Sequence, residues 1–146
     1  MNELKDKEQK KKLNVQEYRR FIEQIGITDV RIISAQINVI DHAYFPSSAQ
    51  VNWKMSASYE QIEGRFSISH RYNVTIKDKK INEIKAKIQV TFLVTYSSKI
   101  PINDDLFKIF KTHNLQVNTW PYFREFVHNS IIRMGWPSFI APVFTI

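Results

Sequence analysis

The sequence predicts an α+β fold in which a four-stranded antiparallel sheet is covered on one face by helices. Four consecutive segments between residues 33 and 96 carry apolar residues at every second position, the period of a strand with one buried face. Two of the three connections between them are short, which favours antiparallel neighbours. Helical patterns precede and follow these segments, and a sheet with one apolar face must be covered on that face.

The N-terminal region divides into a charged segment and a short helix. Residues 1–13 lack apolar periodicity, so we expect a mobile tail there and a single domain over residues 14–146. Asn14 can cap the helix, because Glu17 follows three residues later in a pattern close to a capping box. Gly26 then ends the helix. The apolar side chains at helical spacing are Val15, Tyr18, Phe21, Ile22 and Ile25.

Each predicted strand has one apolar face, and the opposite faces are rich in Ser, Thr, Asn and Lys. The apolar face of the first strand carries Ile33, Ala35, Ile37 and Val39. That of the second carries Val51, Trp53, Met55, Ala57 and Tyr59. That of the third carries Phe66, Ile68, His70, Tyr72, Val74 and Ile76, and we expect the histidine to be a hydrogen-bonded core residue. That of the fourth carries Ile84, Ala86, Ile88, Val90, Phe92, Val94 and Tyr96.

The connection between the first and second strands differs from the other two. Short turns near Glu63-Gly64 and at residues 77–80 join the later strands. The segment 41–48 is longer and contains Tyr44, Phe45 and Pro46. This apolar loop requires a role in packing or in binding.

Two helical patterns follow the strands. A short helix around residues 104–111 begins at two aspartates, which suit the positive end of a helix dipole. A longer one covers residues 120–134, with Pro121 in its first turn because proline lacks an N–H. Gly135 can adopt the left-handed position after its last turn, and Pro137 prevents continuation. The stripe expected to cover the sheet consists of Trp120, Phe123, Phe126, Val127, Ser130, Ile131 and Met134.

The opposite face of the long helix is more apolar than a solvated surface requires. It carries Tyr122, Glu125, Asn129, Ile132 and Arg133. Tyr122 and Ile132 are either two scattered exposed residues or part of a second packing surface, such as a subunit interface. The segment 136–146 is also very apolar, and it either packs back on the domain or forms part of a binding surface.

Composition and missing motifs exclude several function classes. The 146 residues are 43% hydrophobic and 13% aromatic, as expected of a folded globular domain. Cysteine is absent, and three glycines cannot build a Gly-rich phosphate loop. No two histidines have an obvious metal-ligand spacing, and no serine lies in a nucleophile elbow. We therefore expect neither enzymatic activity nor a metal or cofactor.

The formal net charge of +7 is spread thinly along the chain. Proteins dedicated to nucleic acids usually concentrate such charge on one helix or stripe, so we expect no specific nucleic-acid partner. No run of about 18 apolar residues is present, and no apolar segment follows the Lys-rich N-terminus as in a signal peptide. We therefore expect a cytoplasmic protein without membrane insertion.

The start of the long helix resembles the signature of the SecB protein-export chaperone family. The sequence Pro121-Tyr122-Phe123-Arg124-Glu125 fits that family's Pro-Tyr-x-Arg-Glu. Arg133, Gly135 and Pro137, followed by Ala141-Pro142-Val143, fit the end of its helix and the segment after it. The order of the four strands also agrees, so the resemblance covers about residues 27–146 in architecture.

This resemblance implies an ATP-independent holdase that binds unfolded or slowly folding polypeptides in apolar grooves. It also implies a homotetramer, a dimer of dimers with long helices packed between sheets. We assign its interfaces to Tyr122, Glu125, Asn129, Ile132 and Arg133. The family's loop between strands one and two helps to form the client groove. We therefore expect that loop and the C-terminal segment to contact clients through Tyr44, Phe45, Pro46, Trp136, Phe139, Ile140 and Phe144.

The chain also departs from export SecB proteins. It is basic where they are acidic, it stops before their further C-terminal helix and motor-binding tail, and it adds an N-terminal helix. These features look more like the SecB-like chaperones of toxin–antitoxin systems, which protect a specific antitoxin, and they put docking on the export motor in doubt. The rival hypothesis is a small-ligand-binding or enzymatic α+β domain with a pocket between sheet and helix.

Overall fold

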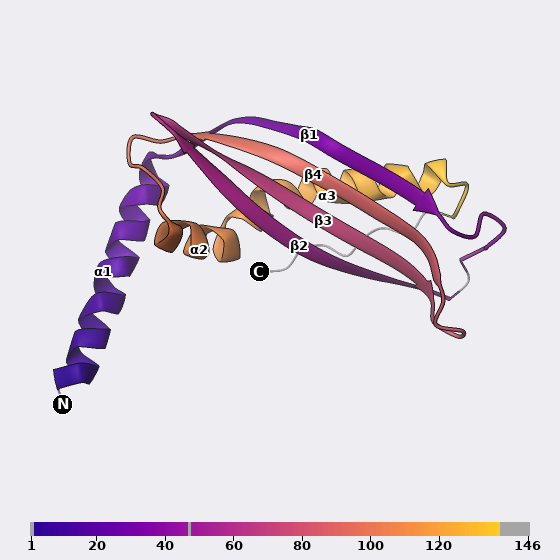
Figure 1. The fold of residues 1–146 in the computed structure, drawn as a ribbon, viewed down its shortest axis with the longest axis horizontal. Helices are drawn as coiled ribbons and strands as arrows, with labels where there is room; N and C mark the ends of the chain where they lie inside the picture. The colour runs from indigo at the N-terminus through magenta and orange to yellow at the C-terminus, as the bar shows by residue number, and fades with distance from the viewer. Residues whose placement is uncertain (1, 47, 138–146) are drawn as a thin grey trace.

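The computed structural model describes residues 2–46 and 48–137, and for residues 8–14 it describes the backbone alone. Within this part of the chain, one helix is followed by four strands and two further helices (Figure 1). The elements are α1 (Asn2–Gln24), β1 (Gly26–Val39), β2 (Ala49–Ile62), β3 (Arg65–Asp78), β4 (Ile84–Ser97), α2 (Asp104–His113) and α3 (Leu115–Arg133). The predicted α+β class is confirmed.

The strands form one antiparallel sheet in the order β1-β4-β3-β2. Two hairpins join β2 to β3 and β3 to β4, as the short turns predicted. The first turn requires a left-handed backbone at Gly64, with φ of 76°, a conformation that glycine adopts without steric cost. The longer connection at residues 40–48 leads from β1 at one edge of the sheet to β2 at the other.

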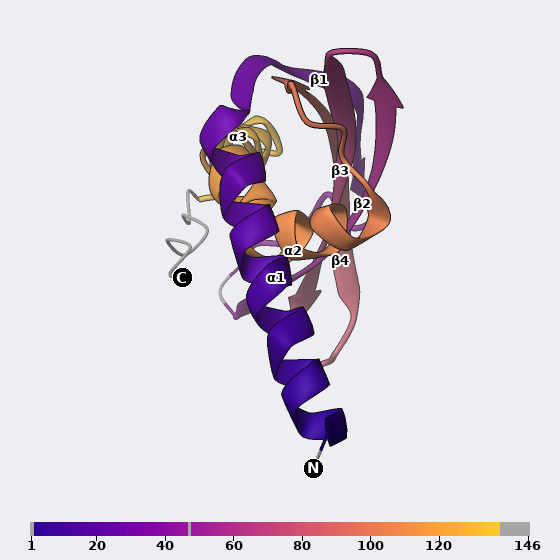
Figure 2. The same cartoon turned by 90° about the vertical axis from the view of Figure 1, so that its left-hand side faces the viewer.

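The core lies between the sheet and the helices, which occupy one side of it (Figure 2). At its centre, the ring of Tyr72 on β3 stacks on Phe123 of α3, with ring centroids 4.0 Å apart. Trp120 of α3 lies 5.5 Å from Trp53 of β2, measured between ring centroids. The predicted stripe on α3 is therefore confirmed, with Trp120, Phe123, Val127, Ser130 and Ile131 buried and Phe126 and Met134 partly buried.

The N-terminal helix begins at Asn2 and not near Asn14, so it includes most of the segment interpreted as a tail. This segment consists largely of Lys, Glu, Gln and Leu and lacks Gly and Pro, a composition that favours helix. Only the C-terminal end of α1 packs on the core, where Phe21 is buried against Phe66 and Phe110. The rest projects from the body of the molecule (Figure 1). Mobility of residues 1–13 stays a prediction.

The long helix α3 begins at Leu115, so Pro121 lies inside it and not in its first turn. Leu115 and Thr119 are fully buried, and this burial stabilises the turn that precedes the proline. Proline removes one helical hydrogen bond to the carbonyl four residues earlier. That carbonyl belongs to Val117, whose side chain is on the exposed side of the helix, where water can replace the missing bond.

The strand β1 differs from the prediction in register and in burial. A bulge between Ile32 and Ser34 leaves Ile33 without a pairing partner on β4, so Ile33 does not continue the row of Ala35 and Ile37. The ring contacts of α3 reach β2, β3 and β4. The expected helical cover therefore holds for three strands, whereas most of β1 is exposed.

Candidate functional site

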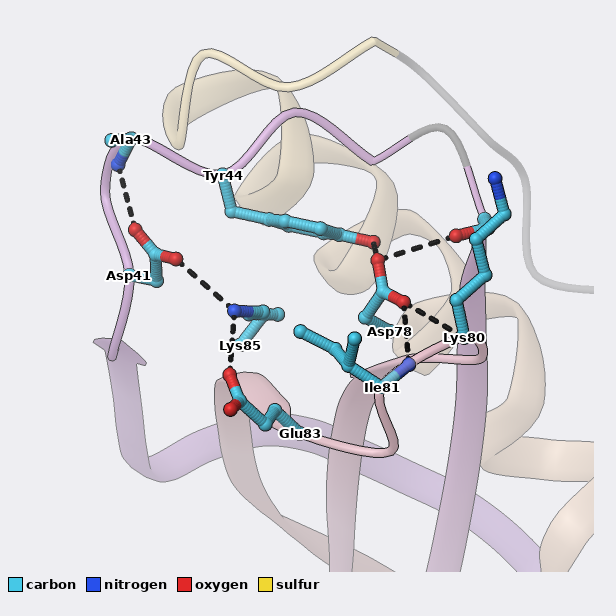
Figure 3. Close-up of polar contacts among 9 residues, drawn as sticks. Asp41, Ala43, Tyr44, Asp78, Lys80, Ile81, Glu83 and Lys85 are labelled. Carbon is cyan, nitrogen blue, oxygen red and sulfur yellow. Dashed lines mark hydrogen bonds and ion pairs between the residues drawn. The ribbon is translucent and has the colours of Figure 1, made fainter.

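The loop at residues 40–48 is attached to the β3–β4 turn by a cluster of polar contacts (Figure 3). Asp78, at the end of β3, accepts hydrogen bonds from the hydroxyls of Tyr44 at 2.8 Å and Ser48 at 3.2 Å. It also accepts two backbone N–H groups of the turn, at 2.8 and 3.2 Å. The hydrogen bond from Tyr44 is the largest of the effects that lower the pKa of Asp78, so this carboxylate is ionised at neutral pH.

Lys85 contacts the same loop from the start of β4. Its Nζ atom lies 3.1 Å from carboxylate oxygens of both Asp41 and Glu83. The hydrogen bonds to Glu83 and then Asp41 raise the pKa of Lys85, and the bond from Lys85 lowers the pKa of Asp41. The same ammonium lies 5.2 Å from the ring centre of Tyr44. Two carboxylates and an aromatic face therefore compensate a lysine that is largely removed from water.

Tyr44 and Trp136 connect this loop to the end of α3. Their rings meet edge to face with centroids 5.7 Å apart, and only 6% of Trp136 is exposed. We call Tyr44, Asp78, Lys85 and Trp136 the loop lock. The charge pattern at residues 77–80 predicted only a turn, because sequence spacing could not show that Asp78 faces a tyrosine 34 residues earlier.

The structure brings four of the predicted client-contact residues to one end of the molecule. Tyr44 and Trp136 pack against each other, whereas Phe45 beside them is 69% exposed and Pro46 is partly exposed. Phe45 is therefore the member of this group that is available to a second chain without rearrangement. The remaining three, Phe139, Ile140 and Phe144, lie outside the described residues.

The predicted interface residues all lie on the exposed side of α3. Tyr122 and Ile132 are each 49% exposed. Asn129 donates a hydrogen bond to Glu125, one turn earlier, and Arg133 lies at the end of the helix. The sequence correctly placed these side chains away from the sheet, and the assignment to an interface stays a prediction.

An apolar strip lies along β1, where the sequence had predicted a covered face and, of the members of the strip, had identified Ile37 alone. We call Ile27, Ile32 and Ile37 the β1 strip; these side chains are on the helix-covered face of the sheet but between 42% and 50% exposed. Tyr122 of α3 borders the strip, because its ring lies 6.5 Å from Phe92, the residue paired with Ile32. Half-exposed isoleucines on an edge strand, beside a half-exposed tyrosine, form a surface suited to contact with another polypeptide.

The buried histidine behaves as predicted for a core residue. His70 Nδ1 lies 2.8 Å from the hydroxyl of Thr119, which is also 2.6 Å from the hydroxyl of Tyr72. Thr119 in turn donates to the carbonyl of Leu115 at 3.2 Å. Burial lowers the pKa of His70 to about 4, so the ring is neutral at pH 7. The network joins β3 to α3.

Little in the described part of the chain supports the rival hypothesis of an enclosed ligand site. A hollow of about 420 Å³ between β2 and the α2–α3 junction is lined by Met55, Ser56, Ala57, His70, Lys111, Thr112 and Gln116. Among the residues described, no group of His, Asp and Glu side chains could hold a metal ion. No helix there is long and apolar enough to cross a membrane.

The arrangement of strands and helices is similar to that of a known chaperone. A solved structure of a SecB-like chaperone of Mycobacterium tuberculosis, in complex with a ChAD peptide from the HigA1 antitoxin, matches with a TM-score of 0.77 at 14% identity. The match covers 86% of this chain and 94% of that chain. No protein-family model matches the sequence, and no curated protein matches it. At this low identity the likeness shows the fold, which is that of SecB-like chaperones, as the resemblance at residues 120–143 predicted.

Proposed function

We propose that this protein is an ATP-independent chaperone that holds unfolded or slowly folding polypeptides, and that it is neither an enzyme nor dependent on a cofactor. The observation that carries the proposal is the match of nearly the whole chain to a SecB-like chaperone in complex with a peptide. The described residues add exposed apolar surface at Phe45, in the loop expected to contact clients. Such surface can hold extended polypeptide through apolar contacts and main-chain hydrogen bonds.

The client is proposed to be an antitoxin in preference to an exported protein. The similar chaperone is solved with an antitoxin peptide. The chain is basic, which favours acidic client segments through long-range attraction. A toxin–antitoxin pair in the neighbouring reading frames would support this role, and a cytoplasmic location is proposed with it.

We further propose that the chain assembles as a homotetramer, a dimer of dimers. The support is the presence of two kinds of uncovered surface on one subunit. The edge strand β1 has outer backbone groups that are not paired with any other described strand, and it carries the β1 strip. The exposed side of α3 carries Tyr122, next to the strip, and Ile132 further along the helix. Pairing at the edge of β1 and packing on the exposed side of α3 are two different contacts, as a dimer of dimers requires.

The first experiment tests holdase activity directly. Light scattering of heated citrate synthase is followed with and without the protein, in the absence of nucleotide. We expect aggregation to be suppressed at stoichiometric amounts of chaperone, because binding of exposed apolar segments needs no energy source. Undiminished aggregation, together with a monomeric mass, would contradict the proposal and favour the small-ligand alternative.

A second experiment tests the client contact at the loop. The variant Phe45→Ser is compared with Ile100→Ser, another exposed apolar side chain near the opposite end of the sheet. We expect Phe45→Ser to weaken binding of reduced, alkylated lactalbumin several-fold while Tm is unchanged, and Ile100→Ser to leave both unchanged. Phe45 is preferred to Tyr44 for this purpose, since Tyr44→Ser would also break the loop lock. Equal affinities of wild type and Phe45→Ser would show that the loop does not contact the client through Phe45.

A further inference from the structure

The face of the sheet opposite the helices is largely polar, although Leu93 and Ile62 also take outward positions on it. Figure 2 shows the helices on one side of the sheet, and none of the described segments covers the other side. Across the middle of this face, one register row is formed by Gln36, Gln89, Asn73 and Lys54, taken from β1 to β2. A neighbouring row is formed by Asn38, Lys87, Thr75 and Asn52. Amides, hydroxyls and ammonium groups therefore alternate on a surface four strands wide.

The charged residues of this face differ between its two halves: one half carries both signs, and the other carries cations alone. At one end, Asp29 and Glu60 lie in the same register row, and Arg31 and Arg65 lie in the rows on either side of it. The other half consists of the outward positions within residues 34–38, 50–56, 71–77 and 87–91, and we call it the basic half. Its charged residues are Lys54, Arg71, Lys77 and Lys87, and it contains no acidic residue.

The cations of the basic half have no acidic partner in the described part of the chain. The ion pairs there join Arg31 to Asp29 and Lys85 to Asp41 and Glu83. Arg71 donates from Nε to the hydroxyl of Thr91 at 3.3 Å, a bond that orients its guanidinium along the surface. The other guanidinium donors remain available. Four cations on one surface repel one another, so an anionic partner would relieve that repulsion.

This face is also hollowed. Within the basic half, a depression of about 300 Å³ is lined by Gln36, Asn38, Asn73, Val74, Thr75, Lys87, Ile88 and Gln89. A second one, also of about 300 Å³, lies across the border of the basic half and is lined by Ser56, Ala57, Ser58, Ser69, Arg71 and Thr91. Polar side chains thus form most of the lining of two concavities, and each concavity has one cation in its lining.

We propose that the basic half docks an acidic polypeptide segment of a partner protein. Carboxylates are bound by Arg and Lys, and the surrounding amides and hydroxyls can bond to a peptide backbone. Alternate side chains of an extended peptide are about 7 Å apart, and diagonal neighbours such as Lys54 and Arg71 are about 8 Å apart at the backbone. Single-stranded nucleic acid is disfavoured, because no outward position of the four strands carries an aromatic residue on which a base could stack.

This surface is separate from the residue proposed to contact clients, since Phe45 lies in the loop between β1 and β2 whereas the basic half lies on the outward face of the strands. An acidic segment could therefore remain bound while an apolar segment is held elsewhere. Docking of an acidic segment on the basic half does not require holdase activity, so either one can be absent without the other.

The test uses the full chain and a labelled peptide of ten glutamates, with fluorescence anisotropy at low salt. The triple variant Lys54→Gln/Arg71→Gln/Lys87→Gln is compared with Lys5→Gln/Lys7→Gln/Arg19→Gln. The second set removes the same charge from exposed positions of α1. We expect the first set to lose at least tenfold in affinity and the second to lose less than twofold. A peptide of ten glutamines should not bind to the wild type.

Three results would overturn the proposal. They are an equal loss for both triple variants, no binding of the glutamate peptide to the wild type, and tighter binding of a ten-nucleotide oligouridine than of the glutamate peptide. Lys54→Arg/Lys87→Arg keeps the charge and should keep the affinity, which separates loss of charge from loss of folding. Suppression of citrate synthase aggregation should be unchanged in Lys54→Gln/Arg71→Gln/Lys87→Gln, so failure here is distinguishable from failure of the proposed function.

Discussion

The two edge strands of the sheet, β1 and β2, have the same length but differ in how much of their inner face is covered by the helices. The inner face of β2 is covered, because Trp53 packs on Trp120 and Tyr59 packs on Phe107. The inner face of β1 has no comparable cover among the described residues, and its isoleucines are half exposed. An edge strand that is already packed contributes stability to the subunit. An edge strand with uncovered apolar residues is available for contacts with another chain.

The first prediction compares the two edges by stability. Trp53→Ala should destabilise the subunit by about 3 kcal/mol, because it removes an aromatic side chain packed against the core. Ile37→Ala should lower the free energy of unfolding by no more than about 1 kcal/mol, since 42% of this residue is already exposed. Urea unfolding of dilute samples measures both. Equal losses would contradict the difference drawn between the edges.

The second prediction concerns the pH dependence of the covered side. Burial lowers the pKa of His70 to about 4 in the folded protein, whereas the same side chain in the unfolded chain has its ordinary pKa of 6.5. Between these two pH values the unfolded chain binds a proton at His70 and the folded protein does not. The stabilisation from the neutral ring is complete above pH 6.5 and is lost as pH falls toward 4, by about 2–3 kcal/mol. Urea unfolding at pH 7, 5.5 and 4 should show this slope, and His70→Gln should be flatter. An identical slope in the variant would assign the effect to other groups.

The third prediction tests what covers the open edge. Ile37→Lys places a charge in the β1 strip and should reduce the mass of the assembly in sedimentation velocity. Ile62→Lys makes the same change at a half-exposed isoleucine at the end of β2 and should leave the mass unchanged. If both variants dissociate, or if neither does, the β1 strip is not a specific contact between subunits.

The smallest expected effect concerns the connection between the two edges. Asp78 has a lowered pKa, so its contribution to stability is present above its ordinary pKa of 3.8 and is lost as pH falls through the folded value. Asp78→Asn should lower Tm at pH 7, and the difference from wild type should shrink at pH 3. Asp6→Asn, on the projecting part of α1, serves as the control. A difference in Tm that stays constant with pH would mean that the ionised carboxylate does not stabilise the lock.

The covered side of the molecule could be predicted from the sequence, because its elements follow local rules. Period-two patterns gave β2, β3 and β4, and the spacing of Trp120, Phe123 and Val127 gave the buried face of α3. The N-cap of α2 also follows a local rule, since Asn103 accepts the N–H of Leu106.

The open edge and the loop lock could not be predicted, because they depend on contacts between distant segments. The strand β1 pairs with β4 and not with β2, the next strand along the chain, and no local pattern in the sequence indicates this. The bulge at Ile33 shifts the apolar row without any glycine or proline to mark it. Likewise, the sequence placed Tyr44 and Trp136 in two separate apolar segments expected to contact clients, and it could not show that their rings pack against each other.

The position of β1 in the sheet also affects how the chain folds. The hairpins of β2, β3 and β4 join neighbouring segments, whereas β1 meets β4 with a sequence separation of up to 71 residues between Gly26 and Ser97. Contacts between distant segments close larger loops and form more slowly. During synthesis, β1 emerges before its partner strand exists, so its isoleucines stay unpaired while the next three strands are made. The chain of this proposed holdase therefore passes through a stage in which it resembles the unfolded polypeptides that we propose it binds.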